Sequence, residues 1–245
     1  MIIVAAGDSF IWGSELKDSP HGGPNGFSQQ TYTALLAKQH DIEYVCAAYP
    51  GNANNAISRM AIDACSKNEN VFLIATWTYP QRSEFYFKDK WVSINSWHTT
   101  EKEFSREYFK HVGNSEYYEL YSVLKEILFL QNYCKTNHIP YLFLTADNHF
   151  YLHENYVRSK DASLENLFNQ IDWCNWFWFP PGLSEWETCA PRGFYQWAAE
   201  NKYKVGKEGH PLEEAHQDAA GLIRNKFNEL VEKYNQQNQI RNQIS

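Results

Sequence analysis

Apolar residues in the first third of the chain form short continuous runs, and these runs alternate with segments of helical periodicity. The runs lie at residues 2–6, 42–48 and 71–76. Such runs are typical of strands that are covered on both faces, as in a parallel sheet. Segments 27–39 and 52–68 lie between the runs and carry apolar residues at helical spacing. The order strand, helix, strand, helix, strand predicts an open parallel sheet.

The middle of the chain departs from this alternation before returning to it. Residues 84–87 and 91–94 flank a short turn of charged residues and predict a hairpin beyond the third strand. Residues 116–138 then predict a long helix, and residues 139–146 predict a fourth strand.

An aromatic-rich segment follows the fourth predicted strand. Aromatic residues make up 16% of the chain, and residues 173–179 are among the richest in them. For any single tryptophan, packing in the core is the better explanation. The cluster as a whole, followed by Pro180-Pro181-Gly182, shows neither helical nor strand periodicity. We therefore expect it to form a cap over the rim of the sheet, shaping a pocket and excluding water.

Charge and cysteine content exclude several classes of protein. A formal net charge of -7, without a basic stripe, argues against binding to a nucleic-acid backbone. No apolar run approaches the length of a membrane span, and no signal peptide is expected. The five cysteines lack metal-ligand spacing, which predicts free thiols in the cytoplasm, although Cys174 and Cys189 could pair in a secreted protein.

The first candidate for chemistry is Ser9, at the carboxyl end of the first predicted strand. Ligand sites in open parallel sheets form at this end of the strands. A serine there, followed by a turn with free amides, can act as a nucleophile beside an oxyanion donor. Considered alone, Asp8 and Ser9 are better explained as the cap of a helix.

The second candidate is His210, which lies directly before the last predicted helix. Pro211 fits the first position of that helix, whose polar end at 236–245 we expect to be frayed. A histidine can take the proton from a serine hydroxyl near neutral pH. Alone, such a residue is more often structural, but beside a rim serine it becomes a candidate base.

These features together resemble the SGNH (GDSL-type) hydrolases, and in particular a branch common in phage and bacterial genomes. Nucleophile, glycine and histidine follow one another in the order and spacing of that family. The matching residues are Gly7-Asp8-Ser9-Phe10 within GDSFxxG, the stretch 51–59 that begins with Gly51, Thr76-Trp77 followed by Arg82, and the GHP-x4-H of residues 209–216.

The resemblance implies a three-layer α/β/α sandwich with a central parallel sheet, the flavodoxin-like SGNH fold. Residues 1–245 would form one domain, with insertions at about 80–112 and 150–205 over the active-site rim. The resemblance also implies ester hydrolysis, in which Ser9 attacks an acyl carbonyl and His210 acts as base and then acid. The backbone amides of Ser9 and Gly51 would stabilise the oxyanion, and Asp8 would belong to the same substrate-binding group.

Two positions depart from the family pattern. The family's Gly-x-Asn-Asp block is replaced by Ala75-Thr76-Trp77-Thr78, so the side-chain oxyanion donor is missing. Asn54, Thr76 or Arg82 are the candidates to replace it. The family's aspartate, three residues before the histidine, is Lys207 here, while Glu208 lies two residues before it. Either Glu208 or a backbone carbonyl would then orient His210, and the chain could be a slow enzyme or an inactive binding module.

The leading functional hypothesis is a serine esterase acting on a small-molecule or glycan ester, such as an O-acetylated carbohydrate. The alternatives are a non-catalytic glycan-binding or virion-associated module, and a lipase or thioesterase. No cofactor is expected, and a metal site from Asp147, His149 and His210 is a weaker hypothesis. Arg59 and Arg82 could bind an anionic substrate group or pair with nearby carboxylates.

Overall fold

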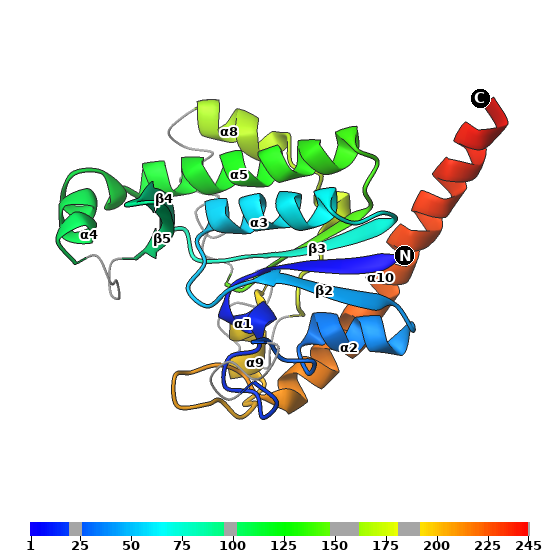
Figure 1. The fold of residues 1–245 in the computed structure, drawn as a ribbon, viewed down its shortest axis with the longest axis horizontal. Coiled ribbons are helices and arrows are strands. Elements are labelled where there is room, and N and C mark those ends of the chain that lie inside the picture. The colour runs from blue at the N-terminus through cyan, green and yellow to red at the C-terminus, as the bar shows by residue number, and fades with distance from the viewer. Residues whose placement is uncertain (20–25, 96–101, 148–161, 181–191, 245) are drawn as a thin grey trace.

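Four parallel strands form the central sheet, in the spatial order β2-β1-β3-β6 (Figure 1). The computed structural model describes residues 1–19, 26–95, 102–147, 162–180 and 192–244. The register pairs Gly7 with Ala48 and Trp77 with Thr145, so the carboxyl ends of the strands meet at one rim. The predicted parallel sheet is confirmed. Its strands are β1 (Ile2–Gly7), β2 (Glu43–Ala48), β3 (Val71–Trp77) and β6 (Tyr141–Thr145).

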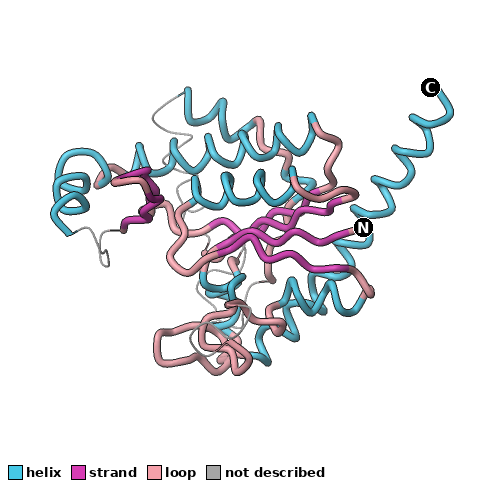
Figure 2. Tube along the Cα trace, in the orientation of Figure 1, coloured by secondary structure: helices cyan, strands magenta, loops and turns pink. Residues whose placement is uncertain are grey.

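Helices cover both faces of this sheet, as Figure 2 shows. One layer holds α3 (Asn54–Ser66) and α5 (Glu116–Thr136), and the other holds α2 (Tyr32–Gln39) and α10 (Glu213–Ile244). Alternate residues of each strand pack into two separate apolar cores, which is why the strands are apolar throughout. The three-layer α/β/α sandwich predicted from the sequence is confirmed. The shorter helical segments are α1 (Ser9–Trp12), α4 (Lys102–Tyr108), a π-helical turn (Phe109–Gly113), α8 (Ala162–Asn169), a 3-10 turn (Trp173–Asn175) and α9 (Phe194–Glu200).

Local capping and pairing shift some predicted helix ends. Helix α2 begins at Tyr32, later than predicted, because the Thr31 hydroxyl accepts the backbone N–H of Ala34 and caps the helix there. Pro211 pairs with Val205 in an isolated antiparallel bridge, so α10 begins at Glu213 rather than at Pro211. Helix α10 also continues through the polar residues from 236 onward to Ile244.

The predicted hairpin is confirmed as β4 (Ser83–Phe87) and β5 (Lys90–Ile94). Its two-residue turn, Lys88-Asp89, has φ values of 49° and 60°, as a tight hairpin turn requires. Two side chains of α3 hold the hairpin. Asn55 exchanges two hydrogen bonds with the backbone of Glu84, and Arg59 pairs with the Glu84 carboxylate at 2.7 and 2.9 Å. The ion-pair explanation of Arg59 is therefore confirmed.

The aromatic cluster at residues 173–179 lies along the edge of the sheet, and the expected rim cap was wrong for it. Trp176 forms a parallel bridge with Phe143 of β6, and the N–H of Phe177 donates to the Phe143 carbonyl at 2.9 Å. Trp176 and Trp178 pack in the layer of α3 and α5, while Phe177 and Phe179 pack in the opposite layer. This is a strand alternation. It is invisible in the hydropathy pattern because both faces are buried, so both sets of positions are apolar. Residues 181–191, which complete the expected cap, lie outside the described residues.

Cys46, Cys65, Cys134 and Cys174 are free thiols, and Cys189 lies outside the described residues. None of the described helices combines the length and apolar composition needed to cross a bilayer.

Candidate active site

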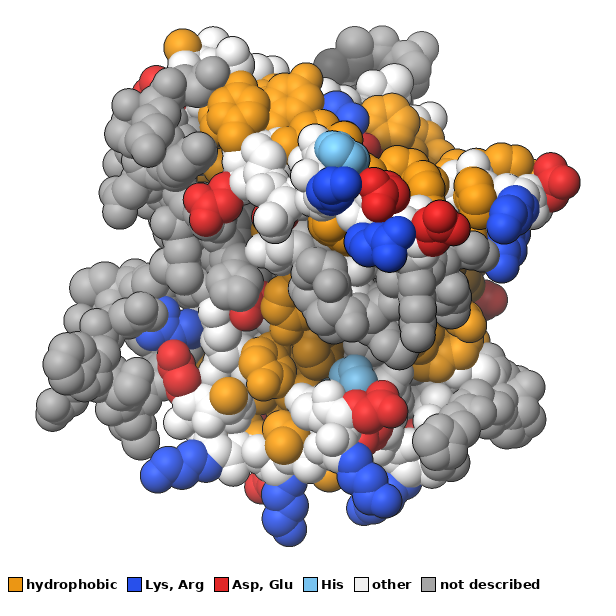
Figure 3. All heavy atoms as spheres, turned by 90° about the vertical axis from the view of Figure 1, so that its left-hand side faces the viewer, with side chains coloured by type: hydrophobic (Ala, Val, Ile, Leu, Met, Phe, Trp, Pro, Cys, Tyr) orange, Lys and Arg blue, Asp and Glu red, His pale blue; other side chains and the backbone are white. Residues whose placement is uncertain are grey.

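Ser9 is the first residue of α1 and lies two residues after the end of β1, at the rim where the strands end. Asp8 caps this helix, since its Oδ1 accepts the N–H of Phe10 at 3.1 Å. Both explanations of this motif therefore hold at once, a helix cap at Asp8 and a serine at the rim. Ser9 is 8% exposed. Figure 3 looks onto this rim and shows hydrophobic side chains at its middle, next to a histidine and acidic side chains.

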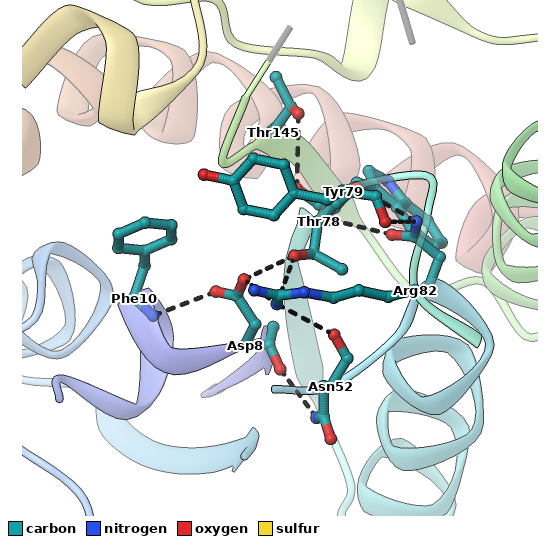
Figure 4. A network of polar contacts seen from close by, with 10 residues as sticks. Asp8, Phe10, Asn52, Thr78, Tyr79, Arg82 and Thr145 are labelled. Atoms are coloured by element: carbon teal, nitrogen blue, oxygen red, sulfur yellow. Dashed lines mark hydrogen bonds and ion pairs between the residues drawn. The ribbon is translucent and has the colours of Figure 1, made fainter. Parts of the chain in front are cut away.

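A buried network, the Asp8 cluster (Asp8, Asn52, Thr78 and Arg82), joins the ends of three strands. Asp8 Oδ2 accepts from Thr78 Oγ1 at 2.6 Å and from Arg82 Nη1 at 2.9 Å. Arg82 Nη1 also donates to the Asn52 carbonyl at 3.3 Å, and Asn52 Nδ2 donates to the Gly7 carbonyl at 2.9 Å. Asp8 is fully buried and the Arg82 side chain is 11% exposed. Figure 4 shows the side chains of Asp8, Thr78 and Arg82 pointing toward one another. The network holds the turns after β1, β2 and β3 in fixed relation.

Gly51 forms the turn at the end of β2, next to this network. Its φ of +80° lies in the left-handed region, which favours glycine. Among the described contacts, the backbone N–H groups of Ser9 and Gly51 have no hydrogen-bond partner. Two unpaired donors from adjacent strand ends are the elements of an oxyanion site.

Two residues predicted as oxyanion donors are committed elsewhere. The Asn54 amide donates to the carbonyls of Thr78 and Tyr79 at 3.2 and 3.4 Å, and its oxygen accepts the N–H of Thr78 at 2.9 Å. The Thr76 hydroxyl is fully buried and hydrogen-bonded to the Tyr32 hydroxyl at 2.6 Å. The hydrogen bonds of Asn54 thus link α3 to the loop after β3, and that of Thr76 links β3 to α2. Of the three replacements considered, Arg82 is the one whose side chain binds Asp8.

His210 is held by a carboxylate from the other end of the chain. Its Nδ1 lies 2.8 Å from Glu15 Oε2, in what we call the Glu15 cluster (Glu15, Gly206, Glu208 and His210). The backbone N–H of Glu208 donates to both Glu15 oxygens at 2.9 and 3.1 Å, and that of His210 donates to Oε2 at 3.3 Å. Burial alone would raise the pKa of Glu15, but these bonds and the His210 side chain bring it below its ordinary value.

Glu208, one of the two candidates to orient His210, makes no contact between its carboxylate and the imidazole among the described hydrogen bonds. Glu208 is exposed and contributes its backbone N–H to the Glu15 carboxylate. The reason is the tight turn between the two residues, where Gly209 has a φ of +88° and donates to the Gly206 carbonyl. Sequence reasoning missed Glu15. The one local feature of the sequence that could have pointed to Glu15 is its position shortly after Ser9, in the turn that follows a very short helix.

The ring of His210 lies beside α1. Its centroid is 5.5 Å from that of Phe10, the neighbour of Ser9. Tyr195 of α9 packs against the same Phe10 ring at 6.1 Å. No hydrogen bond joins Ser9 Oγ to His210 among the described contacts. In unliganded sites such bonds are often long and tighten only when substrate binds.

The end of β6 completes the rim. Asp147 is buried there, and Gln196 of α9 donates to its Oδ1 at 3.2 Å. Burial, with the charges of Asp147 and Asp8, raises the pKa of Tyr79, so this phenol is neutral. Within the described residues, no group of three or more metal-ligating side chains gathers. His149, a ligand of the metal hypothesis, lies outside them.

A second histidine, His216, is buried beneath the rim. Its Nδ1 accepts the N–H of Tyr32 at 3.1 Å, and its ring stacks on Tyr32 with centroids 5.6 Å apart. Burial, aided by the charge of His210, lowers its pKa to about 3. His216 is therefore neutral and joins α10 to α2.

A groove of about 660 Å³ runs alongside Glu15. Trp12 and Tyr49 form an edge-to-face pair in its wall, with centroids 5.3 Å apart, and Tyr49 is 59% exposed. Polar groups lie beside these rings, since the lining is Trp12, Ser14, Glu15, Ser19, Tyr49, Pro50, Gly206, Lys207, Glu208 and Leu212. Because Trp12 is in the helix of Ser9 and Pro50 precedes Gly51, the groove begins next to both.

Comparison with known proteins identifies the fold of the chain through solved structures. Neither a family model nor a curated protein matches the chain. Among solved structures, it is similar to a protein from Desulfitobacterium hafniense DCB-2 described as lipolytic and of the G-D-S-L family. The TM-score is 0.50 and the identity 14%, over 91% of this chain and 98% of the other. This likeness shows that the chain has the fold of the GDSL-type proteins.

Two further structures are less similar. One is the psychrotrophic esterase EstA from a Pseudoalteromonas species, with a TM-score of 0.48 and 11% identity over 95% of this chain and 97% of the other. The other is a carbohydrate esterase, with a TM-score of 0.48 and 13% identity over 93% of this chain and 64% of the other.

Proposed function

We propose that the chain is a serine esterase of the SGNH (GDSL-type) family, with Ser9 as nucleophile and His210 as base. The observation that carries the proposal is the convergence of three groups at one rim. Ser9 follows the end of β1, Gly51 follows the end of β2, and the ring of His210, held by a carboxylate, packs on the residue next to Ser9. The shared fold supports it.

The reaction follows from the chemistry of these groups. Ser9 Oγ attacks the acyl carbon while His210 Nε2 takes the hydroxyl proton. The N–H groups of Ser9 and Gly51 stabilise the oxyanion of the tetrahedral intermediate. The carbon–oxygen bond of the ester then breaks, and the alcohol leaves with the proton from His210. Water attacks the acyl-enzyme in the same way, which releases the acid and restores Ser9.

The groove favours a glycan ester, such as an O-acetylated sugar, over a long acyl chain. Sugars bind against exposed ring faces beside polar groups, and the groove offers Trp12 and Tyr49 beside Ser14 and Lys207. A lipase or thioesterase would require an apolar tunnel for its acyl chain. The groove instead mixes charged, hydroxyl and aromatic side chains.

A catalytically inactive glycan-binding module is the second candidate. Two observations favour it. The family's oxyanion asparagine is absent, and no hydrogen bond joins Ser9 to His210 among the described contacts. Such a module would use the same groove without turnover.

Hydrolysis of p-nitrophenyl acetate by the wild type, Ser9→Ala and His210→Ala tests the esterase. We expect both variants to lose at least about 10³-fold in kcat/KM. A fluorophosphonate probe should label Ser9, as mapped by mass spectrometry. The exposed serine at the end of α3 provides the control Ser66→Ala, which should retain activity and labelling.

Substrate class is tested by comparing p-nitrophenyl acetate, p-nitrophenyl dodecanoate and an acetylated xylo-oligosaccharide. Release of acetate from the oligosaccharide with little turnover of the dodecanoate ester supports the glycan substrate. A folded wild type with neither turnover nor a probe adduct would point to the binding module.

A further inference from the structure

The carboxylate on His210 does not come from the part of the chain where the family pattern has it. That position is Lys207, whereas Glu15 lies 195 residues before His210 in the sequence. We infer that Glu15 is the positioning acid of this site, an inference that rests on the esterase proposed above. It holds His210 in the tautomer and orientation that let Nε2 accept the proton of Ser9.

The first argument is the contact between the two side chains. Glu15 Oε2 lies 2.8 Å from His210 Nδ1, the distance of a charge-assisted hydrogen bond. The side chains are only 18% and 15% exposed, so water competes weakly for this contact. A carboxylate on Nδ1 keeps the proton there and leaves the lone pair on Nε2.

The second argument is that the histidine loop is built around this carboxylate. Three further hydrogen bonds reach it, from the backbone N–H groups of Glu208 and His210. Gly206 approaches so closely that a Cβ there would lie 2.5 Å from both carboxylate oxygens. A side chain at residue 206 would therefore displace the Glu15 carboxylate from the position it occupies under the loop.

The third argument is the backbone of Glu15 itself. Its φ is 67°, in the left-handed region that residues other than glycine rarely adopt. The turn before it is held by two hydrogen bonds, from the N–H groups of Gly13 and Ser14 to the Ser9 carbonyl, both at 2.9 Å. The turn that carries Glu15 is thus tied to the backbone of Ser9, which couples the position of the acid to that of the nucleophile. Strained conformations of this kind persist only where the surroundings hold them.

The other acids near the rim are engaged elsewhere. Asp8 binds Thr78 and Arg82, and Asp147 accepts from Gln196. Among the described acidic side chains, Glu15 is the one in contact with the His210 ring.

The test compares Glu15→Gln and Glu15→Ala with Glu208→Gln, the acid expected from the sequence. We expect the two Glu15 variants to lose about 10²- to 10⁴-fold in kcat on p-nitrophenyl acetate, while KM changes less than about threefold. Glu208→Gln should lose at least ten times less. Glu15→Asp should recover part of the loss. Glu214→Gln, at an exposed acid of α10 that does not line the groove, is the control for a change of charge.

A second readout does not depend on turnover. In ¹⁵N-histidine-labelled protein, the His210 ring, assigned by the signals lost in His210→Ala, should carry its neutral-form proton on Nδ1. In Glu15→Ala the proton should move toward Nε2. If Glu15→Ala does not fold, Glu15→Gln provides the same comparison with the side-chain shape preserved.

The two proposals fail in different ways. An inactive wild type with His210 protonated on Nδ1 would overturn the esterase and retain the pairing of Glu15 with His210. An active wild type whose Glu15 variants keep kcat within about threefold and keep the same tautomer would overturn the role of Glu15.

Discussion

Asp8 and Glu15, the central acids of the two clusters, lie on either side of helix α1 and the turn after it. Their carboxylates have different partners. Asp8 precedes Ser9 directly, is fully buried, and binds the helix N-terminus, Thr78 and Arg82. Glu15 comes six residues after Ser9, and its carboxylate is turned toward the loop that ends in His210. Closeness to Ser9 in the sequence therefore does not indicate which acid contacts His210.

The physical difference is in the partners. Asp8 forms an ion pair with the almost buried Arg82 and ties three strand ends together, so its removal should affect the folded state. Glu15 faces an ionisable ring that changes its protonation in the proposed reaction, so its removal should affect turnover. The predictions below separate these two effects.

The largest effect is expected from breaking the Asp8 cluster. Asp8→Ala leaves Arg82 charged and almost buried, and breaking a buried ion pair in this way costs about 3–5 kcal/mol. Urea unfolding measures the loss. The double variant Asp8→Ala/Arg82→Leu should lose less than Asp8→Ala, because no unpaired charge remains. A loss below about 1 kcal/mol in Asp8→Ala would contradict the assigned role.

The next effect is a pH dependence of stability at His216. Its pKa is about 3 in the folded state against an ordinary 6.5, so below pH 6.5 the unfolded chain binds a proton that the folded protein does not. Stability should therefore fall as the pH drops from 6.5 toward 3. The loss between pH 6.5 and pH 5 is about 1.6 kcal/mol, because the full slope of about 1.4 kcal/mol for each pH unit is reached only well below pH 6.5.

The control for this prediction is His216→Asn, whose Oδ1 can accept the N–H of Tyr32 in place of Nδ1. Urea unfolding at pH 5, 6 and 7 should give a steeper acid loss for the wild type than for this variant. Parallel curves would show that His216 takes up its proton in the folded state.

A smaller effect is expected from Glu15 on stability. Hydrogen bonds from the histidine loop lower the pKa of Glu15. The stability that its carboxylate contributes is therefore fully present above the ordinary pKa of 4.5, and it is lost as the pH falls through the lowered pKa of the folded state. Glu15→Gln should unfold about 1 kcal/mol more easily at pH 7 and show a reduced difference at pH 3. Paired thermal melts at the two pH values measure this. A difference that grows at low pH would contradict the prediction.

The smallest effect concerns the groove next to the Glu15 cluster. Tyr49→Ala should raise KM for an acetylated oligosaccharide about threefold, through the loss of one exposed aromatic face. It should leave p-nitrophenyl acetate hydrolysis nearly unchanged. Tyr86→Ala, at a tyrosine of similar exposure on the hairpin, is the matched control and should change neither. Equal effects of the two variants on KM would contradict the assignment of the groove as the glycan site.

The amino-acid sequence by itself determined the parallel sheet, the hairpin and the place of Ser9 and Gly51 just after the first two strands. Continuous apolar runs separated by helical segments allow few other arrangements, because buried parallel strands must be apolar on both faces. The same property hid the edge segment at 173–179, where a buried alternation has no polar positions to mark it.

Only the tertiary structure decided which polar side chains meet. It paired Glu15 with His210 across 195 residues, and it committed Asn54 and Thr76 to structural hydrogen bonds. Local periodicity reports which face of an element is buried, and it carries no information about the partner on another element. The identity of the acid on His210 depends on a left-handed turn at Glu15 and a missing side chain at Gly206, and both act only once the two ends of the chain have come together.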